Sequence, residues 1–459
     1  MTANINAGSG PWYQGLTRYH WFVLIVAALG WLFDCLDQQL FTLARVPAIT
    51  ELLTINGEPP PTREAVALYS GYATSIFLIG WATGGLIFGV LGDKIGRAKT
   101  MMWTILIYSV CTGLSAASVG FWDFAFYRFI TGLGVGGEFA VGVALVAEVM
   151  PDRARPYAIS LLQALSAVGN ISAALINIGL GQIEDTGISQ WRIMFIIGAF
   201  PALLALVIRS RLKEPERWKS ISAKGSAAKE LGSYGALFGH PVWRYRAFVG
   251  LALAFAGVVG LWGIGFFSPD LIRSTFTAHF KAQGMSDAEV SKALFLWTGI
   301  TMIVQNVAGF VGIGCFGLAA QRIGRRPTFA VAFVGAMVST ALVFWNLREF
   351  SQIFWMVPLM GFFQFSLFGG YAVYFPELFP TSLRSTGVSF CYNVGRFVAA
   401  SGPLALGLLT SKVFAGHPEA FRYAGVTMCA VFLVGLIALP FAPETKGQPL
   451  PEEERGLVH

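Results

Sequence analysis

Charged residues are scarce in this chain of 459 residues: only 12% are Asp, Glu, Lys or Arg, whereas 55% are hydrophobic. A soluble domain carries about 25% charged residues, so the composition argues against a soluble globular protein. The sequence also lacks a cluster of cysteine and histidine, a phosphate-binding glycine loop and a nucleophile elbow. We therefore expect no metal site, no cofactor, no ATP-driven step within this chain and no enzymatic activity. The polar N-terminal residues, with no basic region before a short apolar core, predict no cleavable signal peptide.

Apolar stretches long enough to cross a bilayer as a helix, which takes about 20 residues, recur along the whole chain. They cover residues 20–44, 67–91, 101–119, 124–149, 157–181, 191–209, 247–272, 293–318, 328–346, 352–376, 385–411 and 421–441. We expect each to be helical, because a backbone in lipid must satisfy its own hydrogen bonds. No stretch alternates apolar and polar residues with period two, which excludes a transmembrane β-barrel. The prediction is an all-α membrane protein of twelve transmembrane helices.

The net charge of +7 does not indicate nucleic-acid binding, because the basic residues follow the positive-inside rule. If the twelve stretches alternate in direction, most Lys and Arg fall on one face, with a concentration in the basic segment 209–246. That bias predicts cytoplasmic termini and a multi-pass protein of the plasma or inner membrane. The expected surroundings are a lipid bilayer, with no nucleic acid, and we expect a monomer.

Three short segments of the first half return in the second half at almost one offset. Residues 89–97 (GVLGDKIGR) match 317–325 (GLAAQRIGR) at 228 residues, Glu-x-x-Pro at 148–151 matches 377–380 at 229, and Pro-Glu at 215–216 matches 443–444 at 228. Basic loops that only set topology explain the charges but not the matching glycines and prolines. We therefore infer an internal repeat.

The repeat divides the chain into two pseudo-symmetric halves of six helices each. We predict an N-terminal half at 1–210, a cytoplasmic linker at 211–246, and a C-terminal half at 247–459 that ends in a short cytoplasmic tail. Parallel repeats of this kind place a substrate site between the halves, near the bilayer midplane. A central cavity is therefore expected there.

The segment 89–97, its degenerate second copy and the repeat together resemble the major facilitator superfamily over essentially the whole chain. Further pieces resemble the sugar porters and their relatives. They are Tyr127-Arg128 with the glycines at 132, 134 and 136, Ala147-Glu148 with Pro151, Trp191-Arg192, the segment 376–380 (PELFP) and the segment 443–447 (PETKG). The resemblance implies a secondary transporter that works by alternating access.

The positions that bind sugar in hexose porters are mostly changed in this chain. By resemblance, the glutamine pair and the asparagine of the seventh helix align with Ala256, Gly257 and Trp262, and the tenth-helix tryptophan aligns with Ala372. Only Gln163 matches a sugar-contacting residue. Because a site without polar partners cannot offset the desolvation of many hydroxyl groups, a sugar or polyol is the alternative substrate rather than the expected one.

Other motifs resemble the sialate and aromatic-acid proton symporters. Asp34 and Asp37 have the Asp-x-x-Asp spacing of that group, although Cys35 replaces its usual glycine, and Gly-Gly-Glu ending at Glu138 is also similar. In the eleventh helix the segment 393–396 (NVGR) is similar again. The resemblance implies proton-coupled symport of a small organic anion, a carboxylate. Proton-coupled export and a transport-incompetent nutrient sensor are further alternatives.

Ionisable groups inside a membrane are costly and by default indicate a function. Asp34 and Asp37 lie three residues apart on one helical face, and their mutual repulsion should let one of them take and release a proton. Asp37 is the first choice for proton coupling, because it aligns with the proton-linked aspartate of a bacterial sugar–proton symporter and Arg128 aligns with its arginine partner. The alternative is that both acids are fixed in ion pairs with Arg128 or Arg45. Glu138 either couples protons or only braces the fourth helix.

Three arginines within or next to the apolar stretches, Arg396, Arg128 and Arg45, are candidates to bind the substrate. Arg396 falls near the midplane in the C-terminal half, where we expect it to face the Asp34–Asp37 pair across the cavity and to hold a carboxylate in two hydrogen bonds. A structural role is the alternative. Arg45, near the outer end of the first helix, either contacts the substrate or only snorkels to the interface.

The remaining candidates are polar groups inside the apolar stretches and a charged cluster in the loops. The polar groups, which either line the cavity or join helices, are Gln38, Gln163, Asn170, Gln305, Tyr371, Tyr374 and Asn393. The charged cluster, which by resemblance is a cytoplasmic latch favouring the outward-open state, comprises Asp93, Arg97, Glu148, Arg153 and Arg155. Simple topology charges are its alternative. Because Gln321 replaces the acid in the second copy, the latch there should be weaker.

Overall fold

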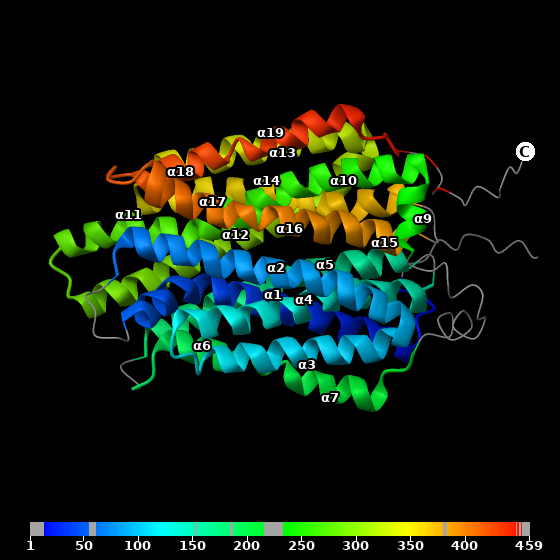
Figure 1. The fold of residues 1–459 in the computed structure, drawn as a ribbon, viewed down its shortest axis with the longest axis horizontal. Helices are drawn as coiled ribbons and strands as arrows, with labels where there is room; N and C mark the ends of the chain where they lie inside the picture. The colour runs from blue at the N-terminus through cyan, green and yellow to red at the C-terminus, as the bar shows by residue number, and fades with distance from the viewer. Residues whose placement is uncertain are drawn as a thin grey trace, which may run out of the picture.

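The computed structural model describes residues 13–54, 61–151, 154–183, 187–214, 233–379 and 383–446, together with Gln448 and Pro451, and the regular elements of these residues are all helical (Figure 1). The N-terminal half contains α1 (Arg18–Thr54), α2 (Arg63–Ile95), α3 (Arg97–Ser115), α4 (Phe121–Val149), α5 (Arg155–Gly181), α6 (Gln190–Ile197) and α7 (Ala202–Arg211).

The C-terminal half follows a short helix, α9 (Tyr234–Gly239). It contains α10 (Pro241–Val258), η2 (Val259–Ile264), η3 (Gly265–Phe267), α11 (Ser268–Ala282), α12 (Asp287–Ile323), α13 (Arg325–Asn346), α14 (Phe350–Leu378), α15 (Arg384–Ser389), η4 (Phe390–Val394), α16 (Gly395–Ala399), α17 (Ser401–Leu408), η5 (Leu409–Val413), α18 (Ala420–Met428), α19 (Val431–Ala438) and η6 (Leu439–Phe441). Helical structure therefore begins inside the segment 211–246 that was expected to be linker.

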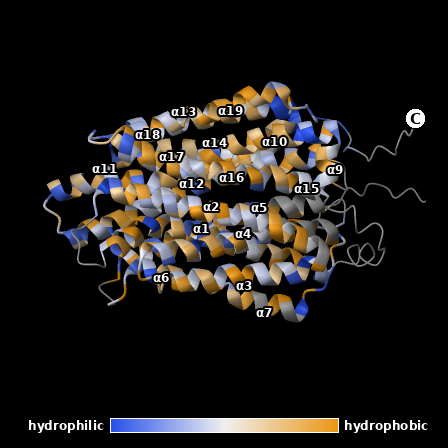
Figure 2. Ribbon diagram, viewed as in Figure 1, coloured by the Kyte–Doolittle hydropathy of each residue, from blue (hydrophilic) through white to orange (hydrophobic). Residues whose placement is uncertain are grey.

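Within the described residues, nine helical stretches are long and apolar enough to cross a membrane, judged by length and composition. Helices α3 and α4 and the α6–α7 pair complete the twelve segments that the sequence predicts. Apolar residues cover most of the helix lengths, while polar residues gather toward the two ends of the bundle (Figure 2). This distribution is the one that a membrane protein needs, because its middle faces hydrocarbon and its ends face water.

The helices form two groups, with α1–α7 below α10–α19 in Figure 1. The groups meet mainly where α2 packs on α16 and α17 and where α5 packs on α12. One end of the bundle, here called the terminal end, carries the start of α1 and the end of α7, which are joined by a hydrogen bond from the Tyr19 hydroxyl to the Lys213 carbonyl oxygen (3.2 Å). The other end, here called the opposite end, carries Thr54 and the turn between α11 and α12.

The internal repeat is visible in the turns at the terminal end. Gly96 (φ +114°) and Gly324 (φ +100°), 228 residues apart, join α2 to α3 and α12 to α13. This backbone region favours glycine. The carboxylates of Glu214 and Glu444 accept hydrogen bonds from the first backbone N–H groups of α3 and α13 (2.9–3.1 Å). The acid that matches Glu444 in this role is thus Glu214; Glu216, which the sequence pattern paired with it, lies outside the described residues.

The repeat also extends to the opposite end. Arg192 donates a hydrogen bond to the Ala116 carbonyl oxygen (2.7 Å), after α3, and Arg422 donates one to the Phe344 carbonyl oxygen (3.0 Å), at the end of α13. The two acceptors are 228 residues apart. Because carbonyl groups at a helix end lack intrahelical partners, these arginines stabilise equivalent turns in the two halves.

Glycine allows α2 and α4 to touch at the backbone. A Cβ atom on Gly84 would overlap the Leu133 carbonyl oxygen, and one on Gly136 would overlap the Trp81 carbonyl oxygen. Small residues permit this approach between membrane helices, where packing rather than water exclusion drives association. Helices α2 and α4 therefore form one closely packed unit.

Regular α-helix is interrupted in the two segments that cross the C-terminal half next to α2. The seventh segment contains the π-helical η2 and the short 3₁₀ turn η3, and the eleventh contains the π-helical η4 and η5. Such π-helical turns frequently lie at functional sites. Here η2 carries Trp262, and η4 directly precedes Arg396.

Candidate functional site

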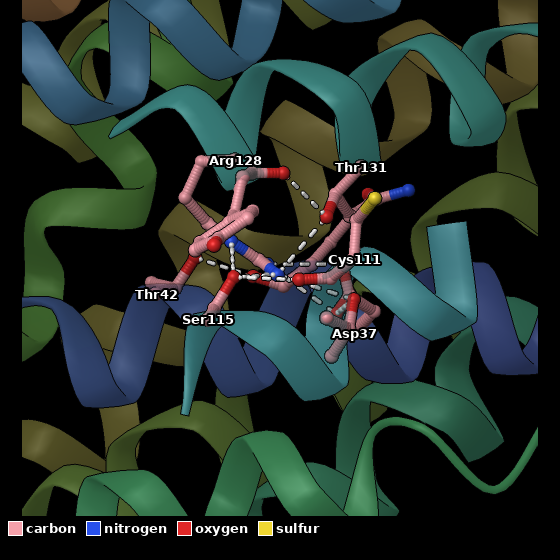
Figure 3. Close-up of polar contacts among 9 residues, drawn as sticks. Asp37, Thr42, Cys111, Ser115, Arg128 and Thr131 are labelled. Atoms are coloured by element: carbon pink, nitrogen blue, oxygen red, sulfur yellow. Dashed lines mark hydrogen bonds and ion pairs between the residues drawn. The ribbon is translucent and has the colours of Figure 1, made fainter. Parts of the chain in front are cut away.

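The first charged cluster lies inside the N-terminal half, between α1, α3 and α4 (Figure 3). Arg128 Nη1 lies 3.4 Å from both carboxylate oxygens of Asp37, and the Thr112 hydroxyl donates to Asp37 Oδ1 (2.6 Å). Arg128 also donates to the Ser115 hydroxyl through Nε and Nη2 (3.0 and 2.8 Å), and Nη2 donates to Thr131 (3.0 Å). The arginine is thus held mainly by hydroxyl groups, and its carboxylate contact is longer than the 2.7–2.9 Å typical of charge-assisted bonds.

The second charged cluster joins Asp34 on α1 to Glu138 on α4. Both side chains are buried, and the Glu138 carboxyl lies against Gly30, one helical turn before Asp34. The charge of Glu138 acts electrostatically on Asp34, and no carboxyl oxygen of the two has a hydrogen-bond partner among the described residues. Two ionised carboxylates buried near each other repel, so protonation of one of them relieves this repulsion.

Both acids of α1 point into the N-terminal half. The partners of Asp37 and the neighbours of Asp34 come from α3 and α4. The expectation that the Asp34–Asp37 pair faces Arg396 across the cavity is therefore wrong. The sequence gives the helical face that two residues share, but not the neighbouring helix that this face meets.

Arg396 lies in the C-terminal half at the contact with α2. Its guanidinium carbon is 4.3 Å from the centre of the Trp81 ring and 5.3 Å from that of Tyr392, and its Nη1 donates to Asn393 Oδ1 (3.2 Å). The side chain is 5% exposed, and its Nε has no hydrogen-bond partner in the described part of the chain. Four arginines there are buried; Arg45, Arg128 and Arg422 each lie within 4.0 Å of a described acid, whereas Arg396 has none.

Aromatic side chains surround this arginine and connect the halves. Trp262 of η2 packs edge-on against Trp81 of α2, with ring centres 5.2 Å apart, and lies 5.9 Å from Phe77. The Phe266 ring packs on Trp262 at 4.4 Å. The region next to Arg396 is thus lined by flat apolar surfaces.

Arg45 does not snorkel to an interface, because α1 continues for nine residues beyond it to Thr54. It is fully buried, and its Nη2 forms an ion pair with Asp270 Oδ2 of α11 at 2.6 Å. The guanidinium also donates to the Thr74 hydroxyl (3.0 Å) and lies over the Phe267 ring at 3.9 Å. This cluster links the two halves toward the opposite end.

The other polar candidates are five amide side chains, described here, and two tyrosines, described below. Asn170 donates to Asn306 across the halves (2.6 Å), Asn393 accepts from Arg396, and the buried Gln38 and Gln305 each have amide atoms without a hydrogen-bond partner in the described residues. Gln163 is half-buried on α5.

Tyr371 and Tyr374 have partners within the C-terminal half. Their hydroxyl groups donate to the carbonyl oxygens of Leu253 (2.7 Å) and Pro443 (2.6 Å). These contacts join α14 to α10 and to the chain after η6, and the Tyr371 ring also lies 6.1 Å from the Tyr392 ring, which lies next to Arg396.

The charged loop cluster is only partly described. Arg153 lies outside the described residues, and nothing is described of the side chains of Asp93, Glu148 and Arg155; Arg97 begins α3. In the second copy Arg325 forms an ion pair with Glu377 (2.6 Å). Despite Gln321, an ion pair therefore remains in that copy.

Sequence reasoning did not assign roles to several residues that the structure places at these sites. They are Trp81, Tyr108, Thr112, Asp270, Arg273 and Tyr392. A signal existed for Asp270, because an acid directly after Pro269 at the end of an apolar stretch is an ionisable group at the membrane.

Two six-helix halves with buried charges at and near their contact define a secondary transporter rather than an enzyme. The family model described as "Sugar (and other) transporter" matches residues 43–237 and 232–457. The chain belongs to this family of the major facilitator superfamily.

Three known proteins illustrate the relationship. A protein of Haemophilus influenzae described only as a metabolite transport protein is 32% identical over 443 residues, covering 95% of this chain and 99% of the relative. The niacin transporter NiaP of Acinetobacter baylyi is 26% identical over 460 residues, covering 94% and 96%. The crystal structure of a D-xylose–proton symporter has the same fold, with a TM-score of 0.71 and 20% identity over 94% of this chain and 100% of that one.

Proposed function

We propose that this transporter carries a small organic carboxylate together with a proton. One observation carries the proposal: Arg396 is a buried cation at the contact of the halves, and no described acid pairs with it. A buried charge needs a partner, and a guanidinium matches a carboxylate in two parallel hydrogen bonds. The niacin transporter among the relatives supports a small carboxylate as the substrate.

The coupling proton is proposed to bind the Asp34–Glu138 pair, and the Asp37–Arg128 pair is proposed to brace α1 against α4. Without substrate, the positive charge of Arg396 balances one negative charge on the acid pair. With a monocarboxylate on Arg396, the charges balance when the acid pair takes up one further proton. Burying an uncompensated charge in a low-dielectric interior is costly. The halves therefore close most readily around the site when it holds neither the substrate nor the further proton, or when it holds both. This balance predicts one proton per monocarboxylate.

The surroundings of Arg396 favour a flat anion over a sugar. Trp262 fills a position where hexose porters use a polar side chain, and a Cβ atom on Gly257 would overlap the Tyr371 hydroxyl. A glutamine at position 257 would therefore need Tyr371 to move. Among the former sugar-contacting positions, Gln163 alone remains polar, which is too few groups to replace the water around several hydroxyls.

The orientation follows from the basic loops. We propose that the terminal end lies in the cytoplasm of the cell and that the protein is a monomer in the cytoplasmic membrane. An anion that enters with one proton then moves without net charge and avoids the cost of about 2.3 kcal/mol per charge per 100 mV against an inside-negative potential.

We also propose that Asp93, Arg97, Glu148, Arg153 and Arg155 form the cytoplasmic latch. The support comes from the second copy, where Arg325 and Glu377 occupy the positions that match Arg97 and Glu148 and form an ion pair. A matching pair in the N-terminal half would hold α3 and α4 together at the terminal end.

Transport into proteoliposomes under an imposed pH gradient tests the proposal. The wild type is expected to accumulate nicotinate or benzoate but not nicotinamide, the neutral analogue of nicotinate. Loss of a buried partner costs about 3–5 kcal/mol, so Arg396→Gln should weaken carboxylate binding by roughly a hundredfold or more.

Binding can be measured by quenching of tryptophan fluorescence, to which Trp81 contributes because it lies against Arg396. Arg396→Lys should restore binding only in part, because lysine lacks the planar fork. Arg348→Gln, which removes an exposed arginine paired with Glu419 in the same half, is the control and should bind as the wild type does. Transport of neutral sugars alone, or unchanged carboxylate binding by Arg396→Gln, would refute the proposal.

A further inference from the structure

Arg45, Asp270 and Arg273 form a charged cluster between the halves, separate from the Arg396 region. Arg45 of α1 reaches across to α11, where its Nη2 lies 2.6 Å from Asp270 Oδ2 and 3.4 Å from the Phe266 carbonyl oxygen. The Thr74 hydroxyl of α2 accepts from Nη1. Arg45 thus already holds a carboxylate, and that carboxylate belongs to the other half.

The cluster contains two cations and one anion. Arg273 lies three residues after Asp270, one turn along α11, and attracts it electrostatically. Its Nη2 is shielded from solvent and has no hydrogen-bond partner among the described residues, as is true of Arg45 Nε. The Asp270 carboxylate therefore has a second cation on its own helix, whereas no other described acid pairs with Arg45.

The cluster lies between the opposite end and the buried acids of α1. Arg45 is eight residues beyond Asp37, about 12 Å along the helix. Around it the halves are in direct contact: the Ser75 hydroxyl donates to the Ala400 carbonyl oxygen (2.6 Å), and Asn177 donates to the Phe295 carbonyl oxygen (2.8 Å). A solute from the opposite end can pass only after these contacts separate.

Separation of the halves divides the cluster unequally. Asp270 moves with Arg273, which still attracts its charge electrostatically. Arg45 moves with Thr74, keeps its hydrogen bond to that hydroxyl, and loses the Asp270 carboxylate together with its contacts to the Phe266 carbonyl oxygen and the Phe267 ring. A guanidinium freed in this way binds the next carboxylate that reaches it.

We propose that Arg45 is a second carboxylate-binding site, which Asp270 occupies while the opposite end is closed and which the transported anion occupies when that end opens. This inference rests on the proposed function, since it assumes that the solute is an organic carboxylate. The anion would bind Arg45 first and Arg396 afterwards. Return of Asp270 to Arg45 would then displace the anion toward the midplane as the end closes.

The test removes the carboxylate of Asp270, which competes for Arg45, together with the guanidinium of Arg396. Nicotinate and benzoate binding to the purified full chain is measured by calorimetry for Arg396→Gln and for the double variant Asp270→Asn/Arg396→Gln. An internal competitor lowers apparent affinity by the fraction of sites it fills, so the double variant is expected to bind at least tenfold more tightly. Adding Arg45→Gln should abolish this gain, and nicotinamide should show none.

Two further variants complete the design. Asp287→Asn/Arg396→Gln removes an exposed acid that pairs with Lys281 at the same end, and it should bind no more tightly than Arg396→Gln. Asp270→Ser provides a second variant without the carboxylate if the asparagine variant does not fold.

The outcomes separate this inference from the proposed function. If the wild type binds nicotinate or benzoate but loss of Asp270 gives no gain, the second site is refuted and the proposed function stands. A gain that survives Arg45→Gln also refutes it. If the wild type binds and transports no carboxylate, the proposed function fails and this inference fails with it.

Discussion

Asp34 and Asp37 lie one turn apart on α1, yet the structure predicts opposite results when each is made neutral. Asp34 faces another acid, Glu138, whereas Asp37 faces a cation, Arg128. Asp34→Asn removes half of a repelling pair and supplies an amide that can donate to Glu138. Asp37→Asn removes the carboxylate that pairs with the buried Arg128.

The magnitudes follow from the contacts. Breaking a buried ion pair outright costs about 3–5 kcal/mol. Arg128 keeps its hydrogen bonds to Ser115, Thr112 and Thr131 in the Asp37→Asn variant, so we expect a smaller loss, about 1–3 kcal/mol of the free energy of unfolding. For Asp34→Asn the stability should change by less than about 1 kcal/mol, because one neutral hydrogen bond replaces a shared proton.

Two measurements in parallel check this contrast. In the first, thermal unfolding of the purified variants should show a lower melting temperature for Asp37→Asn and little change for Asp34→Asn. In the second, proteoliposomes should show that Asp34→Asn has lost accumulation driven by a pH gradient but retains exchange of substrate across the membrane. The folded fraction of Asp37→Asn should still accumulate substrate.

A reversed pattern would refute the reasoning. If Asp34→Asn accumulates substrate as the wild type does, while Asp37→Asn folds normally and accumulates none, Asp37 is the proton carrier, as the resemblance to sugar–proton symporters implies. Asp123→Asn serves as the control, since Asp123 only accepts backbone hydrogen bonds from Val119 and Gly120 at the start of α4.

Two further predictions concern the terminal end. If the latch operates, Asp93→Asn should shift the protein toward inward-open states and so increase the labelling of cysteines introduced on the cytoplasmic side. Unchanged labelling on both faces would contradict the latch. Gln321→Asn, at the matching position of the second half, is the control. Partial burial opposes the charge of Glu444, but backbone N–H groups of Arg325, Arg326 and Lys446 stabilise it, so its pKa is lowered. The contribution of Glu444 to stability is therefore present above the unfolded-state pKa of about 4.3 and is lost as pH falls through the lower folded-state value. The melting temperature should decrease in this acidic range, and it should decrease less in Glu444→Gln. Equal dependence of the melting temperature on pH in the two proteins would disprove this role of Glu444.

The sequence predicted the features that depend on local composition and on repetition. The length of the apolar stretches predicted the number of segments, and the matching segments 89–97 and 317–325 predicted an internal repeat. The structure shows that Gly96 and Gly324 of these segments both have a positive φ, which favours glycine. Arg396 was predicted near the midplane because of its depth in an apolar stretch, and the structure places it against Trp81 of α2, although it does not face the Asp34–Asp37 pair.

The remaining errors have physical causes. The apolar stretch seemed to end at Ala44 because a charged residue follows, but α1 continues through Pro47 to Thr54, so Arg45 lies well inside the helix. Its partner is 225 residues away in the other half, a contact that no local pattern encodes. The direction in which the Asp34–Asp37 face points likewise depends on how α1 packs against α3 and α4.

The acids of α1 and α4 belong to one half of the molecule, and Arg396 belongs to the other. On the proposed function, only the chain between α7 and α10 covalently links the acids that would bind the proton to the arginine that would bind the substrate. Substitutions in the second half could therefore change what is carried without disturbing the driving reaction. A gene fusion of this first half to the second half of a relative with a different substrate should yield a hybrid that accumulates the relative's substrate at the expense of the same gradient. After duplication of an ancestral gene, the substrate could thus have changed through substitutions in one half while the other half stayed the same.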